Sequence, residues 1–328
     1  MKKSTFGIIF SLLLVTFWVS SCTKSPDPDS KKVKIGITCI VEHPFLEDAR
    51  KGFLDRMTEM GYKAGENVSY DYRNAFGKIE NANTIASAFI GNKVDLIYSI
   101  STPATQAVKE KTVEIPIVFA AVTDPLAAGL VDSLEKPGNN VTGTTDKIPT
   151  QYLLMTIKEI MPLLKKLGVP YNAGEANSAS VVKEMKQLSS EYGIQVIETT
   201  ATNSADVSQA ISSLVTKVDA IYMPPDNTMA SALNVIADIC IKNSIPLFSC
   251  ESESVKNGEA LAALSVNHYE LGVEAANMAI QILEKKALPG EIPVRGLKKY
   301  DLDINLNRAK KLGLEIPEAV LKEASIIQ

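Results

Sequence analysis

The chain has 328 residues, enough for about two domains with a core each, which excludes a small disulfide-stapled scaffold. Hydrophobic residues make up 45% and charged residues 22%, as in an ordinary globular protein. The formal net charge is −4 and there are 2 histidines, so neither a basic nucleic-acid surface nor a histidine-based metal centre is indicated. We therefore expect no nucleic-acid partner and no bound metal.

The N-terminus resembles the leader of a bacterial lipoprotein. Two lysines precede an apolar run over residues 6–19, which is shorter than the roughly 18 residues that a membrane-spanning helix needs. The run ends in VSSC, the last letter being Cys22, and a polar stretch follows. The resemblance implies a signal peptide over residues 1–21, a lipid on Cys22 and a tether over residues 22–32. The body would then lie outside the cytoplasm, in the periplasm or at the cell surface; a cleaved signal with an unmodified Cys22 is the alternative.

Three cysteines remain in the body, Cys39, Cys240 and Cys250. They form no CxxC motif or close pairing of the kind that binds zinc. One disulfide is possible in an oxidising compartment, but we expect buried thiols.

Beyond the tether, short apolar runs alternate with longer segments of helical period, which indicates an α/β fold with parallel sheets. Phe45, Ala49, Phe53 and Met57 recur every four residues along one face of the first predicted helix, and a later helix over 269–283 carries Ala and Gly that suit close packing. Strands covered by helices on both faces read as such continuous apolar runs. Seven strands are predicted over residues 33–40, 94–100, 115–122, 165–171, 218–224, 245–250 and 260–266.

The two halves of the body are alike, with three strand–helix units each and a turn-rich stretch over 138–149 between them. This predicts two Rossmann-like lobes with a ligand cleft between them. An extended segment over 291–304 and a final helix do not look like a third domain, so we expect the chain to cross between lobes more than once. The predicted lobes are 33–147 plus 268–298 at the N-terminal side and 148–267 plus 299–328 at the C-terminal side.

Small polar or acidic residues follow the predicted strands at helix starts. In an open α/β sheet, ligands bind beyond the carboxyl ends of the strands, where helix N-termini offer free N–H groups to an anion. The same residues could simply cap helices, since caps have this composition. The positions are Glu42-His43-Pro44, Ser101-Thr102-Pro103, Thr123-Asp124-Pro125, Asn172 through Asn177-Ser178, Asp226-Asn227-Thr228 and Glu251-Ser252.

Seven segments of the body, taken in order, carry a family resemblance. They are VEHPFLEDARKGF, STPATQAVKEKT, IPIVFAAVTDPLAAGLV, EKPGNNVTGTTD, YNAGEANS, KVDAIYMPPDNT and YELGVEAANMAIQIL. They resemble the substrate-binding lipoproteins of ABC importers for tryptophan or other aromatic amino acids. The resemblance implies the type I periplasmic-binding-protein fold, three crossings between lobes and a ligand captured by closure. It also implies an ABC permease with a separate ATPase subunit as partner, a lipid anchor in the membrane, a monomer and no cofactor.

An amino acid presents a carboxylate, an ammonium and a side chain, so its site needs donors, a carboxylate and a pocket. We assign the ligand carboxylate to the helix starts at Ser101-Thr102 and Asn177-Ser178, where hydroxyl and backbone donors match an anion.

For the ligand ammonium we choose Asp226, with Asp124 second and Glu42 third, and Asn227 could share the contact. The rings of Phe45 and Tyr171 could stack on an aromatic ligand, although core packing is their alternative role.

Thr123 and Glu251 complete the predicted set, since each follows the end of a strand; Glu251 could line the pocket or only cap a helix. His43 could reach the cleft beside Glu42, but we expect a hydrogen-bonded structural histidine.

Other functions fit the sequence less well. The first strand–helix turn reads CIVEHPFLED without the GxGxxG of a dinucleotide site, and neither GxxxxGKS nor GxSxG occurs. We therefore expect no enzyme. A sensor lipoprotein that hands the same ligand to a signalling receptor, a receptor for another small polar ligand and a ligand-free structural lipoprotein remain alternatives.

Overall fold

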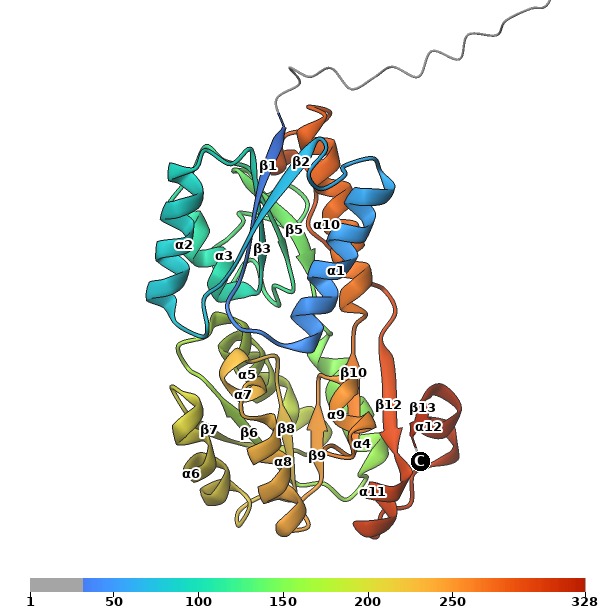
Figure 1. Ribbon diagram of the computed structural model, residues 1–328. Helices are drawn as coiled ribbons and strands as arrows, with labels where there is room; N and C mark the ends of the chain where they lie inside the picture. The colour runs from blue at the N-terminus through green and yellow to red at the C-terminus, as the bar shows by residue number, and fades with distance from the viewer. Residues whose placement is uncertain (1–31, 328) are drawn as a thin grey trace, which may run out of the picture. The chain divides into compact units, whose positions relative to one another are not determined.

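The computed structural model describes residues 32–327. The predicted signal peptide, Cys22 and all but the last residue of the predicted tether lie outside the described residues. Within 32–327, no helix is long and apolar enough to cross a membrane. The chain folds into two α/β lobes, each built on its own sheet (Figure 1).

The sheet of the first lobe has six strands in the order β11-β5-β4-β3-β1-β2, and every neighbouring pair is parallel. Strands β3 and β4 are buried along their whole length, because helices cover both faces of the sheet. The strands are β1 (Val33–Cys39), β2 (Val68–Asn74), β3 (Leu96–Ile100), β4 (Ile117–Ala120), β5 (Val141–Thr145) and β11 (Arg295–Gly296).

Four helices cover this sheet, two on each face (Figure 1). One face carries α1 (Pro44–Glu59) and α10 (His268–Leu283), and the other carries α2 (Ile79–Gly91) and α3 (Thr102–Lys109). Helix α1 begins at Pro44, where the missing N–H costs no hydrogen bond. A short 3-10 turn, η2 (Pro289–Glu291), precedes β11.

Helices α1 and α10 pack unusually closely. A Cβ atom on Gly52 would lie 2.0 Å from the carbonyl oxygen of Tyr269, and one on Gly272 would lie 2.0 Å from that of Ala49. The small residues expected to favour close packing on the helix over 269–283 therefore do so, and α10 completes the core of the first lobe although it follows nearly all of the second lobe in the sequence.

The second lobe has a seven-stranded sheet in the order β13-β12-β10-β9-β8-β6-β7. It is parallel except that β12 runs antiparallel to β10. The expected parallel sheet is therefore present, with one antiparallel pair, which arises because β10 leads the chain into the first lobe and β12 brings it back. The strands are β6 (Lys166–Tyr171), β7 (Gln195–Thr200), β8 (Ala220–Met223), β9 (Leu247–Ser249), β10 (Ala262–Ser265), β12 (Asp301–Asn305) and β13 (Ser325–Ile327).

The second lobe buries two hydrophobic clusters. The first cluster includes side chains of α4, α5, α11 and α12, and the second includes side chains of α6, α7, α8 and α9. These helices are α4 (Thr150–Ile160), α5 (Ala176–Leu188), α6 (Ser204–Leu214), α7 (Asn227–Ala230), α8 (Leu233–Lys242), α9 (Ser252–Lys256), α11 (Leu306–Lys311) and α12 (Glu318–Glu323), with the 3-10 turn η1 (Ser189–Tyr192) after α5.

The described chain passes between the lobes three times. It leaves the first lobe after β5, returns after β10 and leaves again between β11 and β12. The connecting residues are 146–149, 266–267 and 297–300. Each lobe is therefore assembled from separate segments of the sequence.

Candidate ligand-binding cleft

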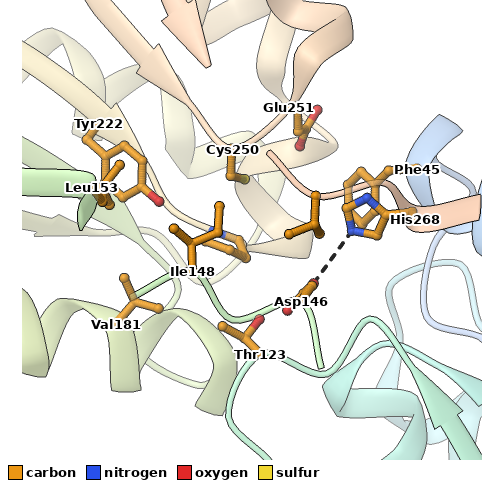
Figure 2. Close-up of a pocket in the computed structure, with 12 residues that line it drawn as sticks. Phe45, Thr123, Asp146, Ile148, Leu153, Val181, Tyr222, Cys250, Glu251 and His268 are labelled. Carbon is orange, nitrogen blue, oxygen red and sulfur yellow. Dashed lines mark ion pairs between the residues drawn. The ribbon is translucent and has the colours of Figure 1, made fainter. Parts of the chain in front are cut away.

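A cavity lies between the two lobes, and much of its lining follows the carboxyl ends of strands. Its empty space is about 490 Å³, including the part that opens to solvent. The lining is mostly apolar, with a few polar side chains among the apolar ones (Figure 2). The lining residues are Phe45, Thr123, Asp146, Ile148, Leu153, Val181, Tyr222, Pro225, Cys250, Glu251, Val266 and His268.

Phe45 forms one wall of the cavity, in the first turn of α1. Its ring lies between two imidazoles, with centroid distances of 4.5 Å to His43 and 4.8 Å to His268. His268 opens α10 and so comes from the opposite end of the first lobe's sequence. The three rings hold each other in place, which gives the cavity a preformed aromatic wall.

Glu251 of the second lobe and His43 of the first lobe meet across the cleft, with 3.4 Å between Glu251 Oε2 and His43 Nε2. Burial raises the pKa of Glu251 to about 8, with the nearby Glu259 carboxylate adding to the effect. Burial and the neighbouring His268 lower the pKa of His43 to about 4. Both groups are therefore mainly uncharged near pH 7, and the contact joins the lobes as a neutral pair rather than as an ion pair.

Asp146 contributes a buried carboxylate from the first connection between the lobes. Its side chain is 8% exposed, and Oδ2 lies 3.7 Å from Nε2 of His268, too far for a hydrogen bond (Figure 2). The other oxygen, Oδ1, is buried without a hydrogen-bond partner. Buried polar atoms are nearly always paired, so this oxygen is available to a ligand in the cavity.

Among the other buried polar atoms without a partner, three lie at the starts of helices α3 and α5: Ser101 Oγ, Thr102 Oγ1 and Asn177 Oδ1. Ser101 and Thr102 start α3, and Asn177 lies in the first turn of α5, which contacts α3 across the lobes. Ser101 has φ 85°, a left-handed conformation that costs energy for a residue with a side chain. Such strain beside unpaired hydroxyl groups is typical of a binding site.

Glu175, at the start of α5, is the centre of a buried hydrogen-bond network. Its Oε1 accepts hydrogen bonds from the backbone N–H and the hydroxyl of Thr228. Its Oε2 accepts from the backbone N–H and side-chain amide of Asn227, and from the amide of Asn177. The Asn177 amide also donates to the carbonyl of Pro225, a cavity residue. Glu175 thus fixes two predicted site residues, Asn177 and Asn227, against each other.

Asp226 caps α7 from within the same region. Its Oδ1 accepts from the backbone N–H of Met229 and its Oδ2 from that of Asn172. Burial, then the nearby Glu175 carboxylate, raise the pKa of Asp226 to about 7. A carboxylate has about four acceptor positions, so at least one remains beside these bonds and the contact with the Ser178 hydroxyl. Ser178, also buried, lies beside Asp226.

The predicted site residues fall into three groups. Phe45, Thr123 and Glu251 line the cavity itself. Six others are buried at the helix starts beside it: Ser101, Thr102, Asn177, Ser178, Asp226 and Asn227. The remaining three predicted residues, Glu42, Asp124 and Tyr171, lie elsewhere.

Tyr171 packs against the core of the second lobe, and its hydroxyl donates to Glu198. Asp124 pairs with Lys147 at 3.1 Å. Glu42 is exposed. None of these three lines the cavity.

Several lining residues were missed from the sequence, notably Asp146, Ile148 and Tyr222. Asp146 lies in the EKPGNNVTGTTD segment that carries the family resemblance, but the surrounding Gly, Asn and Thr indicated only a turn. Ile148 and Tyr222 are apolar or aromatic and read as core residues.

Cys39, Cys240 and Cys250 are free thiols. Burial raises the pKa of Cys39 to about 11 and that of Cys240 to about 12, so neither is a reactive thiolate near neutral pH. Within residues 32–327, no group of three or more His, Cys, Asp or Glu side chains is arranged to hold a metal ion.

Two lobes of α/β type, joined by three connections and enclosing a cavity, define the type I periplasmic-binding-protein fold. Residues 34–327 match the family of ABC transporter substrate-binding proteins, and the chain belongs to this family. Substrate-binding proteins of ABC transporters are a non-enzymatic class that works outside the cytoplasm.

Three relatives are similar over nearly their whole length. A tyrosine-binding protein of Clostridioides difficile is 42% identical over 288 residues, covering 88% of this chain and 83% of that protein. The ABC domain of Streptococcus pneumoniae in complex with L-Trp is 34% identical, with a TM-score of 0.87 over 91% of this chain and 100% of that one. The ligand-free, open structure of a substrate-binding protein with adhesive properties from Clostridium difficile is 40% identical, with a TM-score of 0.68 over 90% of this chain and 99% of that one.

Proposed function

We propose that the protein captures an aromatic amino acid between its lobes and delivers it to the permease of an ABC importer. The observation that carries the proposal is the cavity between the lobes, which combines apolar walls with buried polar atoms that have no partner in the protein. Relatives named for tyrosine binding and solved with L-Trp support the ligand class.

The ligand carboxylate binds at the start of α3. Ser101 Oγ and Thr102 Oγ1 are unpartnered donors there, and the N-terminus of an eight-residue helix adds free backbone N–H groups and a positive dipole end. Ser178, at the start of α5, donates to the backbone carbonyls of Asn172 and Glu175, each at 3.3 Å, and would exchange these long hydrogen bonds for one to the ligand carboxylate.

The ligand ammonium pairs with Asp226, which directly follows the cavity residue Pro225. In the unliganded protein the pKa of Asp226 is raised to about 7. An ammonium group beside it would favour the ionised form, so binding would lower this pKa. Asn227 lies next to the contact, held by Glu175.

The aromatic ring occupies the apolar part of the cavity, against Phe45, Ile148 and Val266. Aromatic pairs in offset or edge-to-face contact contribute about 0.5–1.5 kcal/mol beyond the area that they bury.

Ligand binding closes the lobes, because contacts from both lobes form only in the closed state. The structural similarity supports this: the TM-score is 0.87 with the L-Trp complex and 0.68 with the ligand-free, open structure, although the latter has the higher sequence identity. Lys147 supports closure as well, since it pairs with Asp124 of the first lobe and with Glu184 of the second.

Delivery requires partners outside this chain. A lipid on Cys22 tethers the monomeric protein to the outer face of a membrane, and the closed form docks on a permease whose separate ATPase subunit hydrolyses ATP. The protein itself catalyses no reaction and uses no cofactor.

Isothermal titration of the mature protein with tyrosine, tryptophan, phenylalanine and leucine tests the proposal. Trp18, the only tryptophan, lies in the predicted signal peptide, so the indole fluorescence of bound tryptophan can be followed without a protein background. We expect saturable binding of at least one aromatic amino acid, with a rise in melting temperature.

Two variants locate the site. Thr102→Val removes one unpartnered hydroxyl and should weaken aromatic amino-acid binding about tenfold, whereas Thr84→Val, on an exposed face of α2, should leave it unchanged. Asp226→Asn should also weaken binding by removing the charge opposite the ammonium. If the folded parent protein bound none of the three aromatic amino acids, the proposal would be wrong.

A further inference from the structure

The unpartnered oxygen of Asp146 contacts neither the carboxylate nor the ammonium of the ligand in the proposed binding mode. Asp146 Oδ1 is buried and unpaired in a cavity whose lining is mostly apolar (Figure 2). The apolar residues include Ile148 and Val266. Such an oxygen costs free energy unless something in the cavity donates a hydrogen bond to it.

The strand order separates Asp146 from Ser101, where the carboxylate of the ligand is proposed to bind. Asp146 follows β5, whereas Ser101 follows β3, and β4 lies between these two strands. Neighbouring strands are about 4.8 Å apart, so the two positions are separated by about 10 Å across the sheet. The carboxylate and the ammonium of an amino acid share one carbon atom. The proposed function, on which this inference rests, places the ligand carboxylate at Ser101 and the ligand ammonium at Asp226, which leaves Asp146 for a donor elsewhere on the ligand.

We infer that Asp146 accepts a hydrogen bond from a donor on the ring of the ligand, so that the cavity selects aromatic amino acids whose ring carries an O–H or N–H group. The phenol of tyrosine and the indole of tryptophan both provide such a donor. Phenylalanine provides none, and would leave Oδ1 unpaired in the closed cleft. A site built around a buried polar group rejects an analogue that lacks the matching donor much more strongly than an apolar pocket rejects a change of size.

The other polar groups around the cavity are less suited to this role. His268 is 3.7 Å from the opposite oxygen of Asp146 and leaves Oδ1 free. The Tyr222 hydroxyl also lines the cavity and is the competing partner for a ring donor, which Tyr222→Phe tests.

Titration calorimetry with tyrosine, O-methyltyrosine, phenylalanine and tryptophan tests the inference. The parent protein should bind tyrosine about 10- to 100-fold more tightly than phenylalanine or O-methyltyrosine, because a hydrogen bond to a charged group is lost with either analogue. This comparison needs no variant. Asp146→Ala should reduce the tyrosine-to-phenylalanine ratio to near one while phenylalanine affinity stays within a few-fold, and Tyr222→Phe should keep the parent's ratio.

The outcomes separate this inference from the proposed function. Equal parent affinities for tyrosine, phenylalanine and O-methyltyrosine would overturn the role of Asp146 but leave an aromatic amino-acid receptor. A proportional loss of tyrosine and phenylalanine in Asp146→Ala would assign Asp146 to the α-groups or to closure. Collapse of the ratio in Tyr222→Phe alone would transfer the role to Tyr222. If the parent bound no aromatic amino acid, both the proposed function and this inference would fail.

Discussion

Glu175 shows how one buried side chain can organise a binding region. Its two oxygens accept hydrogen bonds from Asn177, Asn227 and Thr228, which belong to two different helices. Replacing the carboxylate leaves several of these donors without an acceptor inside the protein, which is more costly than the loss of an exposed contact.

We therefore expect Glu175→Gln to lower the free energy of unfolding by about 3 kcal/mol, because an amide supplies only one acceptor oxygen to this network. Urea denaturation followed by circular dichroism would measure the change. Glu198→Gln is the control, since Glu198 makes a partly exposed ion pair with Lys186 and should cost less than about 1 kcal/mol. Equal costs for the two variants would show that the Glu175 network does not stabilise the fold.

Three buried groups predict how stability depends on pH. In the folded protein the pKa of Glu251 is raised to about 8 and that of Asp226 to about 7, while that of His43 is lowered to about 4. The folded state therefore binds more protons at the two carboxyls, and fewer at His43, than the unfolded state does. Because of the two carboxyls, the free energy of unfolding falls as the pH rises toward about 8. Because of His43, the free energy of unfolding rises with pH, but only up to 6.5, the ordinary pKa of histidine.

Above pH 6.5 only the carboxyls act, so the unliganded protein should lose stability of the order of 1 kcal/mol between pH 6.5 and 8. Urea unfolding at the two pH values measures this loss. Glu251→Gln should reduce it, whereas Glu253→Gln, at an exposed neighbouring position, should retain it. A stability that rises across this interval would contradict the assignment.

The sequence predicts which residues lie near the site better than it predicts what their side chains contact. Ser101, Thr102 and Asp226 were identified because polar residues after strands meet at one edge of a sheet. Tyr171 shows the limit of that argument, because the direction of a side chain at a strand end depends on packing that the sequence does not state. Asp146 was missed for a related reason, since a lone carboxylate in a turn has no pattern of its own.

At the level of whole elements, the contact between α1 and α10 depends on two glycines. A methyl group on Gly272 would lie 2.0 Å from the carbonyl oxygen of Ala49, so the helices would have to separate. We expect Gly272→Ala to destabilise the protein by about 3 kcal/mol.

Gly91→Ala is the matched control, because Gly91 also lies in a helix but, apart from its chain neighbours and the backbone of its own helix, no atom lies within 4 Å of the place where its methyl group would stand. It should be neutral or stabilise the protein by up to about 1 kcal/mol. Thermal melts of both variants would decide the matter; similar melting temperatures would contradict the close-packing argument.

The strands that could be predicted are those buried on both faces. All seven expected strands are present, because a strand between two helical layers must be apolar throughout. Strands β2 and β7 were missed, since both lie at sheet edges and are only partly buried. Strand β5 was missed because its sequence, VTGTT, lies within the stretch that was interpreted as a turn-rich boundary.

For the molecule as a whole, Lys147 offers a way to test closure. It lies in a connection between the lobes and pairs at 3.1 Å with Asp124 and at 3.2 Å with Glu184. Partly exposed ion pairs contribute about 0.2–1 kcal/mol each. Lys147→Ala should therefore weaken ligand binding about two- to fivefold, mainly through faster dissociation, as measured by stopped-flow fluorescence with tryptophan. Lys183→Ala, an exposed position beside Glu184, should leave the dissociation rate unchanged.

The three passages between the lobes also govern the order in which the protein can fold as it is made. The hydrogen bond from Arg56 to Asn277 joins residues 221 positions apart, and α1 lacks the helix that packs beside it on the sheet until α10 leaves the ribosome. The first lobe is complete only after Gly296, and the second only after Ile327. Whereas domains commonly fold in sequence during synthesis, neither lobe here can finish early. Because neither lobe can fold completely until synthesis is nearly finished, the nascent chain remains able to pass through a translocation channel before it folds.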